Sequence, residues 1–205
     1  MEWKGFNDYS KMRAEQLAKL GYVGFAIDMY GKGVYAKDHD EAAKLSGVYR
    51  NDRNLMRERA RAALETLKKN PMVDSSRIAA IGYCFGGAAV LEMARAGFDL
   101  RGFVTFHGSL DTPMPAEHGS VKGKILVLHG AEDRFVTQEQ VSNFQEEMRK
   151  AGTDSKVVQF DGAVHGFTVL SNGSDKSSGV AYNEAADKHS WELMKNFLRE
   201  VFGAK

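Results

Sequence analysis

Cysteine, proline and net charge are all scarce in this chain, which has one cysteine, three prolines and 28 basic residues against 27 acidic ones in 205 positions. A single cysteine excludes a disulfide framework, a Cys-x-x-Cys redox pair and a cysteine-based zinc site. Balanced charge, with no basic stripe interleaved with aromatic residues, makes nucleic acid and anionic membranes poor partners. No apolar run is long enough to span a membrane, and Met1 to Asp8 lack the apolar segment of a signal peptide. We therefore expect a cytoplasmic protein.

Hydrophobic patterning predicts strands that alternate with helices. The apolar runs typical of buried parallel strands are at 22–28, 77–81, 102–106, 124–128 and 156–160. Helical patterns lie between them, at 7–20, 40–69, 88–96, 137–150 and 182–202, and we expect the second to break near Gly47. This alternation predicts an α/β fold with a mainly parallel sheet of about five strands, in a single domain over residues 1–205.

The only cysteine, Cys84, stands between a predicted strand and a predicted helix, within the run Gly82 to Gly87. Glycines two positions before and after a nucleophile allow the strand and helix to cross closely at a sharp turn. The start of a helix also favours a thiolate, because its partial charge is positive. The pattern predicts a nucleophilic thiol, although a lone cysteine is also commonly a small, inert core residue.

Two further residues follow predicted strands in the order that α/β-hydrolases use, which is nucleophile, acid, histidine. Asp133 comes after the strand at 124–128, and His165 comes after the strand at 156–160. An imidazole can move the proton that thiol chemistry requires, and a carboxylate can fix the tautomer of that imidazole. Taken singly, each residue could equally be a turn or core residue, so the prediction depends on the three occurring together.

Several segments of the chain resemble the dienelactone hydrolase family. They are residues 2–7, 20–22, 28–31, 82–87, 129–133 and 162–167, and the resemblance spans essentially the whole sequence. It implies an α/β-hydrolase fold, a three-layer sandwich, and the cleavage of small carboxylic esters or lactones without a cofactor. It also implies Cys84 as nucleophile, His165 as base and acid, and Asp133 as the residue that orients His165.

The resemblance implies three more site residues. The backbone N–H of Phe85, next after the nucleophile, would be one donor to the oxyanion. By position, the N–H of Trp3 would be the second donor. Glu2 matches the glutamate that in this family contacts the resting thiol and moves when substrate binds.

The sequence departs from the family pattern in two places. Family members have further strands before the segment that holds Glu2, so we expect either a member that lacks its N-terminal strands or a sheet that closes differently. The arginine that follows the His-x-Phe turn in the founding enzymes is replaced by Thr168-Val169-Leu170. Arg50, Arg53 or Arg57 could substitute for it, but the sequence does not show this, so dienelactone itself is a doubtful substrate. A rival interpretation is a catalytically impaired, truncated domain that self-associates, because open sheet edges favour pairing with another chain. The sequence therefore leaves open whether the protein forms a homo-oligomer.

Other candidates carry weaker signals. His107 and His129 also end predicted strands, but with His165 they lack the local spacing of a metal motif, so we expect no metal. A structural role is the simpler interpretation of His107, and lining the pocket is its alternative. Certain aromatic residues could form an acyl or alcohol pocket or could belong to the core: Trp3, Tyr30, Tyr35, Phe135 and Phe167.

Overall fold

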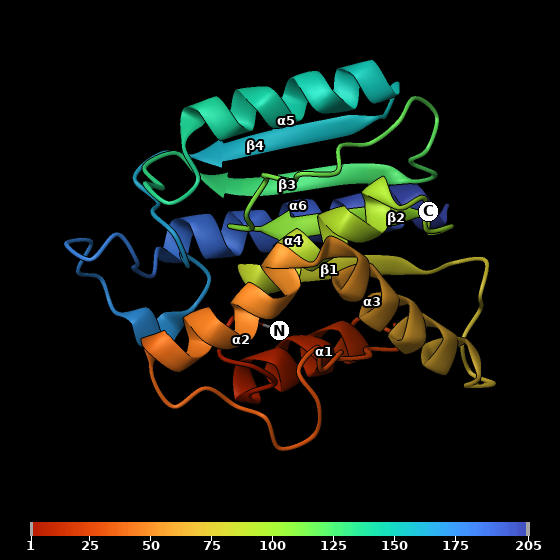
Figure 1. Ribbon diagram of the computed structural model, residues 1–205, viewed down its shortest axis with the longest axis horizontal. Helices are drawn as coiled ribbons and strands as arrows, with labels where there is room; N and C mark the ends of the chain where they lie inside the picture. The colour runs from red at the N-terminus through yellow and green to blue at the C-terminus, as the bar shows by residue number, and fades with distance from the viewer. Residues whose placement is uncertain (1, 204–205) are drawn as a thin grey trace. The chain divides into compact units, whose positions relative to one another are not determined.

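The computed structural model describes residues 2–203 and contains two compact units, Met1–Ser75 and Ser76–Lys205 (Figure 1). Among residues 2–203, no helix combines the length and the apolar character needed to cross a membrane.

The first unit contains three helices, each begun by a polar cap. They are α1 (Asp8–Lys19), α2 (His39–Asn51) and α3 (Arg53–Lys68). The side chains of Asn7, Asp38 and Asp52 precede them and accept hydrogen bonds from backbone N–H groups of the first turns. These N–H groups have no partner within a helix, so the caps define where each helix begins.

The predicted break near Gly47 is wrong, because the helical region is interrupted at Asp52 instead. Gly47 lies inside α2, whereas Asp52 has an extended backbone, with φ −124° and ψ 90°. Its carboxylate accepts a hydrogen bond from the N–H of Leu55 at 2.9 Å. An aspartate cap stabilises the start of a helix by about 1 kcal/mol, and one glycine inside a helix destabilises it by a similar amount. The cap at Asp52 therefore starts a new helix, while α2 tolerates Gly47.

The predicted strand at 22–28 is also wrong. The segment carries no strand assignment, and none of the four described strands pairs with it. The segment contacts α1 closely at Gly24, where an added Cβ would overlap the carbonyl of Ala14. Val23 and Phe25 are 44% and 43% exposed. Apolar composition gives a segment the side chains of a strand, but a strand also requires a neighbour for its hydrogen bonds.

The second unit contains a four-stranded parallel sheet in the order β1-β2-β3-β4. Its strands are β1 (Ala79–Tyr83), β2 (Gly102–Phe106), β3 (Lys124–Gly130) and β4 (Ser155–Phe160). β2 is buried along its whole length and β3 nearly so, as expected of central strands covered on both faces. Four of the five predicted strands are therefore confirmed.

Helices cover both faces of this sheet. α4 (Phe85–Arg95) packs on β1 and β2, and α5 (Gln138–Ala151) packs on β4. α6 (Glu184–Phe202) packs on β2 and β3 and lies behind the sheet in Figure 1. A short 3₁₀ turn, η1 (Leu170–Asn172), follows the last strand. Parallel strands joined by right-handed crossovers place α4 and α5 on the same face, so this unit has the predicted three α/β layers.

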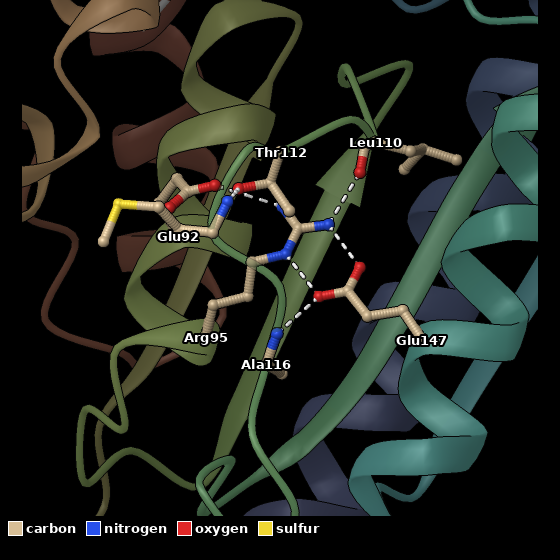
Figure 2. A network of polar contacts seen from close by, with 7 residues as sticks. Glu92, Arg95, Leu110, Thr112, Ala116 and Glu147 are labelled. Atoms are coloured by element: carbon tan, nitrogen blue, oxygen red, sulfur yellow. Dashed lines mark hydrogen bonds and ion pairs between the residues drawn. The ribbon is translucent and has the colours of Figure 1, made fainter.

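A buried ion-pair network joins α4 and α5 to the connection between β2 and β3 (Figure 2). The guanidinium of Arg95 donates to Glu92 at 3.2 Å, to Glu147 at 2.8 Å and to the carbonyl of Leu110 at 2.6 Å. Glu147 also accepts from the N–H of Ala116 at 2.8 Å. The irregular segment after β2 is thus held to α4, the helix that begins directly after Cys84.

Candidate functional site

Cys84 occupies the sharp turn between β1 and α4 that the sequence predicts. Its backbone has φ 51° and ψ −116°, a left-handed conformation that is rare for a residue with a Cβ. Its N–H donates to the carbonyl of Phe106 at 3.0 Å, which joins the turn to β2. A Cβ on Gly82 would overlap the carbonyl of Gly86 and lie 2.6 Å from the nitrogen of Gly87. The close crossing of strand and helix therefore requires glycine at position 82.

Asp133 is fixed in the turn after β3. Its Oδ1 accepts hydrogen bonds from the N–H groups of Phe135 at 2.8 Å and Val136 at 3.1 Å. Its side chain has no exposed surface. Although burial opposes its charge, hydrogen bonds from His165 and from these two N–H groups hold the pKa of Asp133 below its usual value.

Gly130 allows the turn after β3 to approach the segment that carries His165. A Cβ on Gly130 would lie 2.6 Å from the carbonyl oxygen of Ala163 and 2.8 Å from that of Val164. The N–H of Glu132 donates to the carbonyl of Ala163 at 2.9 Å, which joins the two turns directly. This contact brings Asp133 within reach of His165.

The three predicted residues form one line of hydrogen bonds. Nδ1 of His165 is 2.8 Å from Oδ2 of Asp133, and its Nε2 is 3.2 Å from Sγ of Cys84. Burial opposes a charged imidazole here, but the Cys84 thiolate and Asp133 outweigh it and raise the pKa of His165 to about 10. The arrangement can therefore hold an imidazolium between two anions, and it can pass a proton at Nε2.

Two aromatic rings enclose the imidazole of His165. The ring of His107 lies edge-on, with centroids 5.3 Å apart and planes at 65°. The ring of Phe135 is also edge-on, at 5.6 Å and 78°, and its side chain is 55% exposed. Phe167 is fully buried and packs against His107 at 5.2 Å. Of the predicted pocket aromatics in this unit, Phe135 is at the surface and Phe167 belongs to the core.

His129 lies at the end of β3 and is 2% exposed. Burial lowers its pKa, because a charged imidazole would lose its hydration there. His165, rather than His129, contacts both Asp133 and Cys84. Within residues 2–203, no three histidine, cysteine or acidic side chains are grouped as metal ligands.

The remaining predicted site residues fall in both units. Phe85 is the first residue of α4, next to Cys84, and is fully buried. Glu2 and Trp3 belong to the first unit. The carbonyl of Glu2 accepts from the N–H of Gly5 at 3.2 Å, and the carbonyl of Trp3 accepts from the hydroxyl of Tyr30 at 2.8 Å. Tyr30 is therefore a buried support for Trp3, while Tyr35 is 47% exposed.

The sequence did not reveal the partner of His107. Its Nε2 is 2.8 Å from Oγ1 of Thr168, 61 positions away in the chain. No local pattern connects the end of β2 to the residue after a His-x-Phe turn. The only sequence signal was the presence of a histidine at the end of a strand next to β1.

Comparison with known proteins gives a consistent result. A sequence model described as the dienelactone hydrolase family matches residues 1–202. The chain is similar to the uncharacterized protein K02A2.1 of Caenorhabditis elegans, with 38% identity over 157 residues, 74% of this chain and 98% of that protein. It is also similar to a carboxymethylenebutenolidase of Pseudomonas sp. strain P51, with 32% identity over 142 residues, 66% of this chain and 58% of that enzyme.

Among solved structures, the chain is similar to P91, described as a dienelactone hydrolase-like promiscuous phosphotriesterase from metagenomic libraries. The identity is 39% and the TM-score is 0.90, and the match covers 98% of this chain and 84% of P91.

Proposed function

The chain belongs to the dienelactone hydrolase family, and from this premise we propose that it hydrolyses small carboxylic esters or lactones through a thioacyl-enzyme formed on Cys84. The observation that carries the proposal is the line Asp133–His165–Cys84, with hydrogen bonds of 2.8 and 3.2 Å. A thiol, an imidazole and a carboxylate in this order are the parts that covalent acyl transfer needs.

In the first half of the reaction, the thiolate of Cys84 attacks the carbonyl carbon of the ester, and the carbonyl electrons move onto oxygen. When the tetrahedral intermediate collapses, the C–O bond breaks and the leaving oxygen takes the proton from Nε2 of His165. The products of this half are a thioester on Cys84 and an alcohol, or an opened chain when the substrate is a lactone.

In the second half, water attacks the thioester carbon while Nε2 of His165 accepts a proton from that water. The C–S bond then breaks, the carboxylic acid leaves and the thiolate of Cys84 returns beside an imidazolium. Asp133 stays ionised throughout, because its hydrogen bonds hold its pKa low. It orients Nδ1 and stabilises the charge on His165.

The developing oxyanion is assigned to backbone donors. The N–H of Phe85 stands at the positive end of α4, next to the nucleophile. From the family resemblance, we assign the second donor to the N–H of Trp3 and contact with the resting thiol to Glu2. These two assignments depend on the resemblance and not on the geometry around Cys84.

Neutral substrates fit the site better than dienelactone. A negatively charged substrate needs a cation, and the position after the His-x-Phe turn holds Thr168, which is 2% exposed and bonded to His107. The exposed ring of Phe135 beside His165 offers an apolar contact instead. We therefore favour short, uncharged esters and lactones.

A second candidate activity is hydrolysis of phosphotriesters, and the similarity to P91 favours it. The thiolate of Cys84 would attack phosphorus in place of carbon and expel an alkoxide or phenoxide, and water would then cleave the S–P bond to release a phosphodiester and return the thiolate. Parallel assays with a nitrophenyl ester and a dialkyl nitrophenyl phosphate separate the two activities by their relative kcat/KM.

The rival to both activities is an impaired hydrolase that self-associates. One observation favours it: β1, which leads to Cys84, is an outer strand of the described sheet and pairs only with β2 there. An outer strand presents backbone groups on which another chain can pair. Sedimentation of the purified protein, run beside the ester assay, distinguishes an active monomer from an inactive assembly.

The decisive experiment measures turnover of a short nitrophenyl ester and follows the mass of the protein. We expect a burst of nitrophenol, a mass increase equal to the acyl group less one hydrogen, and loss of both in Cys84→Ala. Cys84→Ser retains at most a trace, because an alcohol needs more help from the base than a thiol does. His118→Ala is the matched control, since His118 is exposed and its Nδ1 lies 3.1 Å from the carbonyl oxygen of Lys150. Undiminished turnover by Cys84→Ala contradicts the proposal.

A further inference from the structure

Two residues other than glycine have a positive φ among residues 2–203, and both lie beside the candidate site. One is Cys84, at φ 51°, and the other is His107, at φ 39°. A left-handed conformation costs a residue with a Cβ roughly 1 to 3 kcal/mol, and such residues are concentrated at functional sites. The conformation of Cys84 is explained by the turn that exposes its thiol, whereas that of His107 has no explanation in the proposed reaction.

His107 is placed to constrain the imidazole of His165. It follows the last residue of β2, and its N–H donates to the carbonyl of Leu128 at 2.8 Å, which fixes its backbone against β3. Its ring meets the ring of His165 edge-on, with centroids 5.3 Å apart. The ring has no exposed surface, so it does not touch substrate.

Thr168, in the turn that follows His165, anchors the ring of His107. The hydroxyl of Thr168 is 2.8 Å from Nε2 of His107, and Thr168 is itself 2% exposed. Phe167 packs edge-on against the same ring at 5.2 Å. The ring is therefore held by a hydrogen bond and by packing, both supplied by the segment that follows His165.

We infer that His107, anchored by Thr168, is a positioning residue that fixes the ring of His165 so that Nε2 faces the sulfur of Cys84. Asp133 and Cys84 bond the two nitrogens of that ring along one line, and contacts along one line leave the ring free to tilt about it. The edge of His107 blocks this tilt from the buried side, and Phe135 packs against the ring as well. The inference rests on the proposed function only in that Cys84 and His165 must act together.

The test uses His107→Asn, because asparagine tolerates a positive φ and removes only the ring. A misplacement on the order of 1 Å in a catalytic group costs about 100-fold in rate, so we expect kcat for a nitrophenyl ester to fall by about that factor. We expect KM to change little, because His107 does not contact substrate. Thr168→Val, which removes the anchoring hydroxyl and keeps the shape, should have the same effect at smaller amplitude.

A second measurement does not depend on ester turnover. The rate at which iodoacetamide alkylates Cys84 is followed against pH, because only the thiolate reacts. When the imidazolium of His165 is displaced from the sulfur, the thiolate loses a stabilising charge, and the midpoint of this profile moves to higher pH. We expect the midpoint of the alkylation profile of His107→Asn to lie between the midpoints of the unchanged protein and of His165→Ala.

The matched control is Met148→Ala in α5, a fully buried residue whose loss destabilises the fold without touching the site. We expect it to lower Tm at least as much as His107→Asn and to leave the alkylation midpoint in place. A wild-type midpoint and kcat in His107→Asn would overturn the inference, as would a shift of equal size in Met148→Ala.

If His107→Asn fails to fold, Thr168→Val decides by the same two readouts. If the unchanged protein does not hydrolyse esters, the proposed function fails, and the alkylation profile alone decides the role of His107.

Discussion

His165 is the residue whose properties depend most on its two neighbours. Its pKa of about 10 arises because the Cys84 thiolate and Asp133 favour the charged ring more strongly than burial opposes it. Each neighbour therefore has a separate and measurable effect on the protonation of His165.

Replacing Cys84 with alanine should lower the pKa of His165 from about 10 toward its ordinary value of 6.5, because the adjacent negative charge is lost. The titration is followed through the imidazole resonances of His165 by NMR. His118→Ala is the control and should leave the pKa of His165 unchanged. An unaltered titration in Cys84→Ala would mean that the sulfur is not ionised beside His165.

The loss of Asp133 should be less damaging than the loss of His165. His165→Ala removes the group that moves the proton and should lower kcat by several orders of magnitude, with Asp133→Asn roughly 10- to 100-fold milder. In the unchanged protein, activity should decline as pH rises through about 10, where His165 loses its proton. In Asp133→Asn this decline should begin at lower pH, since the carboxylate no longer favours the imidazolium. Equal losses in both variants, or an unmoved alkaline limb, would contradict the assigned roles.

At the scale of elements, the crossing of β1 and α4 depends on the absence of a side chain at position 82. Gly82→Ala places a methyl group against the carbonyl of Gly86, and overpacking of this kind commonly costs about 1 to 3 kcal/mol. Urea denaturation measures the loss. Gly47→Ala is the matched control, since position 47 lies in α2 with open space around it, and it should stabilise by up to about 1 kcal/mol. A Gly82→Ala protein as stable as the unchanged one would mean that the crossing is looser than described.

The ion-pair network between α4 and α5 should be sensitive to loss of Arg95. Arg95→Met leaves the carboxylates of Glu92 and Glu147 buried without their partner, and breaking a buried pair in this way costs about 3 to 5 kcal/mol. The comparison is Arg149→Met, which removes an exposed pair with Glu146 and should have no measurable effect. Similar denaturation midpoints for the two variants would show that the network contributes little.

Element types were predictable wherever the local pattern determined them, and failures came from partners distant in sequence. The turn at Cys84 follows from local chemistry and is as predicted. The segment at 22–28 has the composition of a strand, but forming a strand also requires a paired neighbouring strand, which the local sequence pattern does not reveal. The pairing of His107 with Thr168 joins positions 61 residues apart, so only the folded sheet reveals it.

For the whole molecule, we propose that residues 1–205 unfold as one domain. Among its described residues, the unit Met1–Ser75 has three helices and no strand of the sheet, and a unit of about this size buries only about 60% of its chain surface when it folds alone, which leaves it marginally stable. Calorimetry should give a single transition with equal calorimetric and van't Hoff enthalpies. Gly47→Ala and Gly82→Ala, one in each unit, should shift that transition in opposite directions without splitting it. Two resolved transitions would show two domains.

The contrast between the two long connections of the second unit matters to anyone who wishes to redesign this protein. The connection after β2 is fastened at Leu110 and Ala116 by buried charges, so transplanting a new sequence there would disturb the helix that supports Cys84. Residues 171–178 are almost entirely exposed, and they follow closely after His165. A library of altered substrate preference should therefore be built in 174–178, where diversity can be tolerated. The connection after β2 and Asn172, whose side chain donates to the carbonyl of Gly166 at 2.9 Å, are kept as parental sequence.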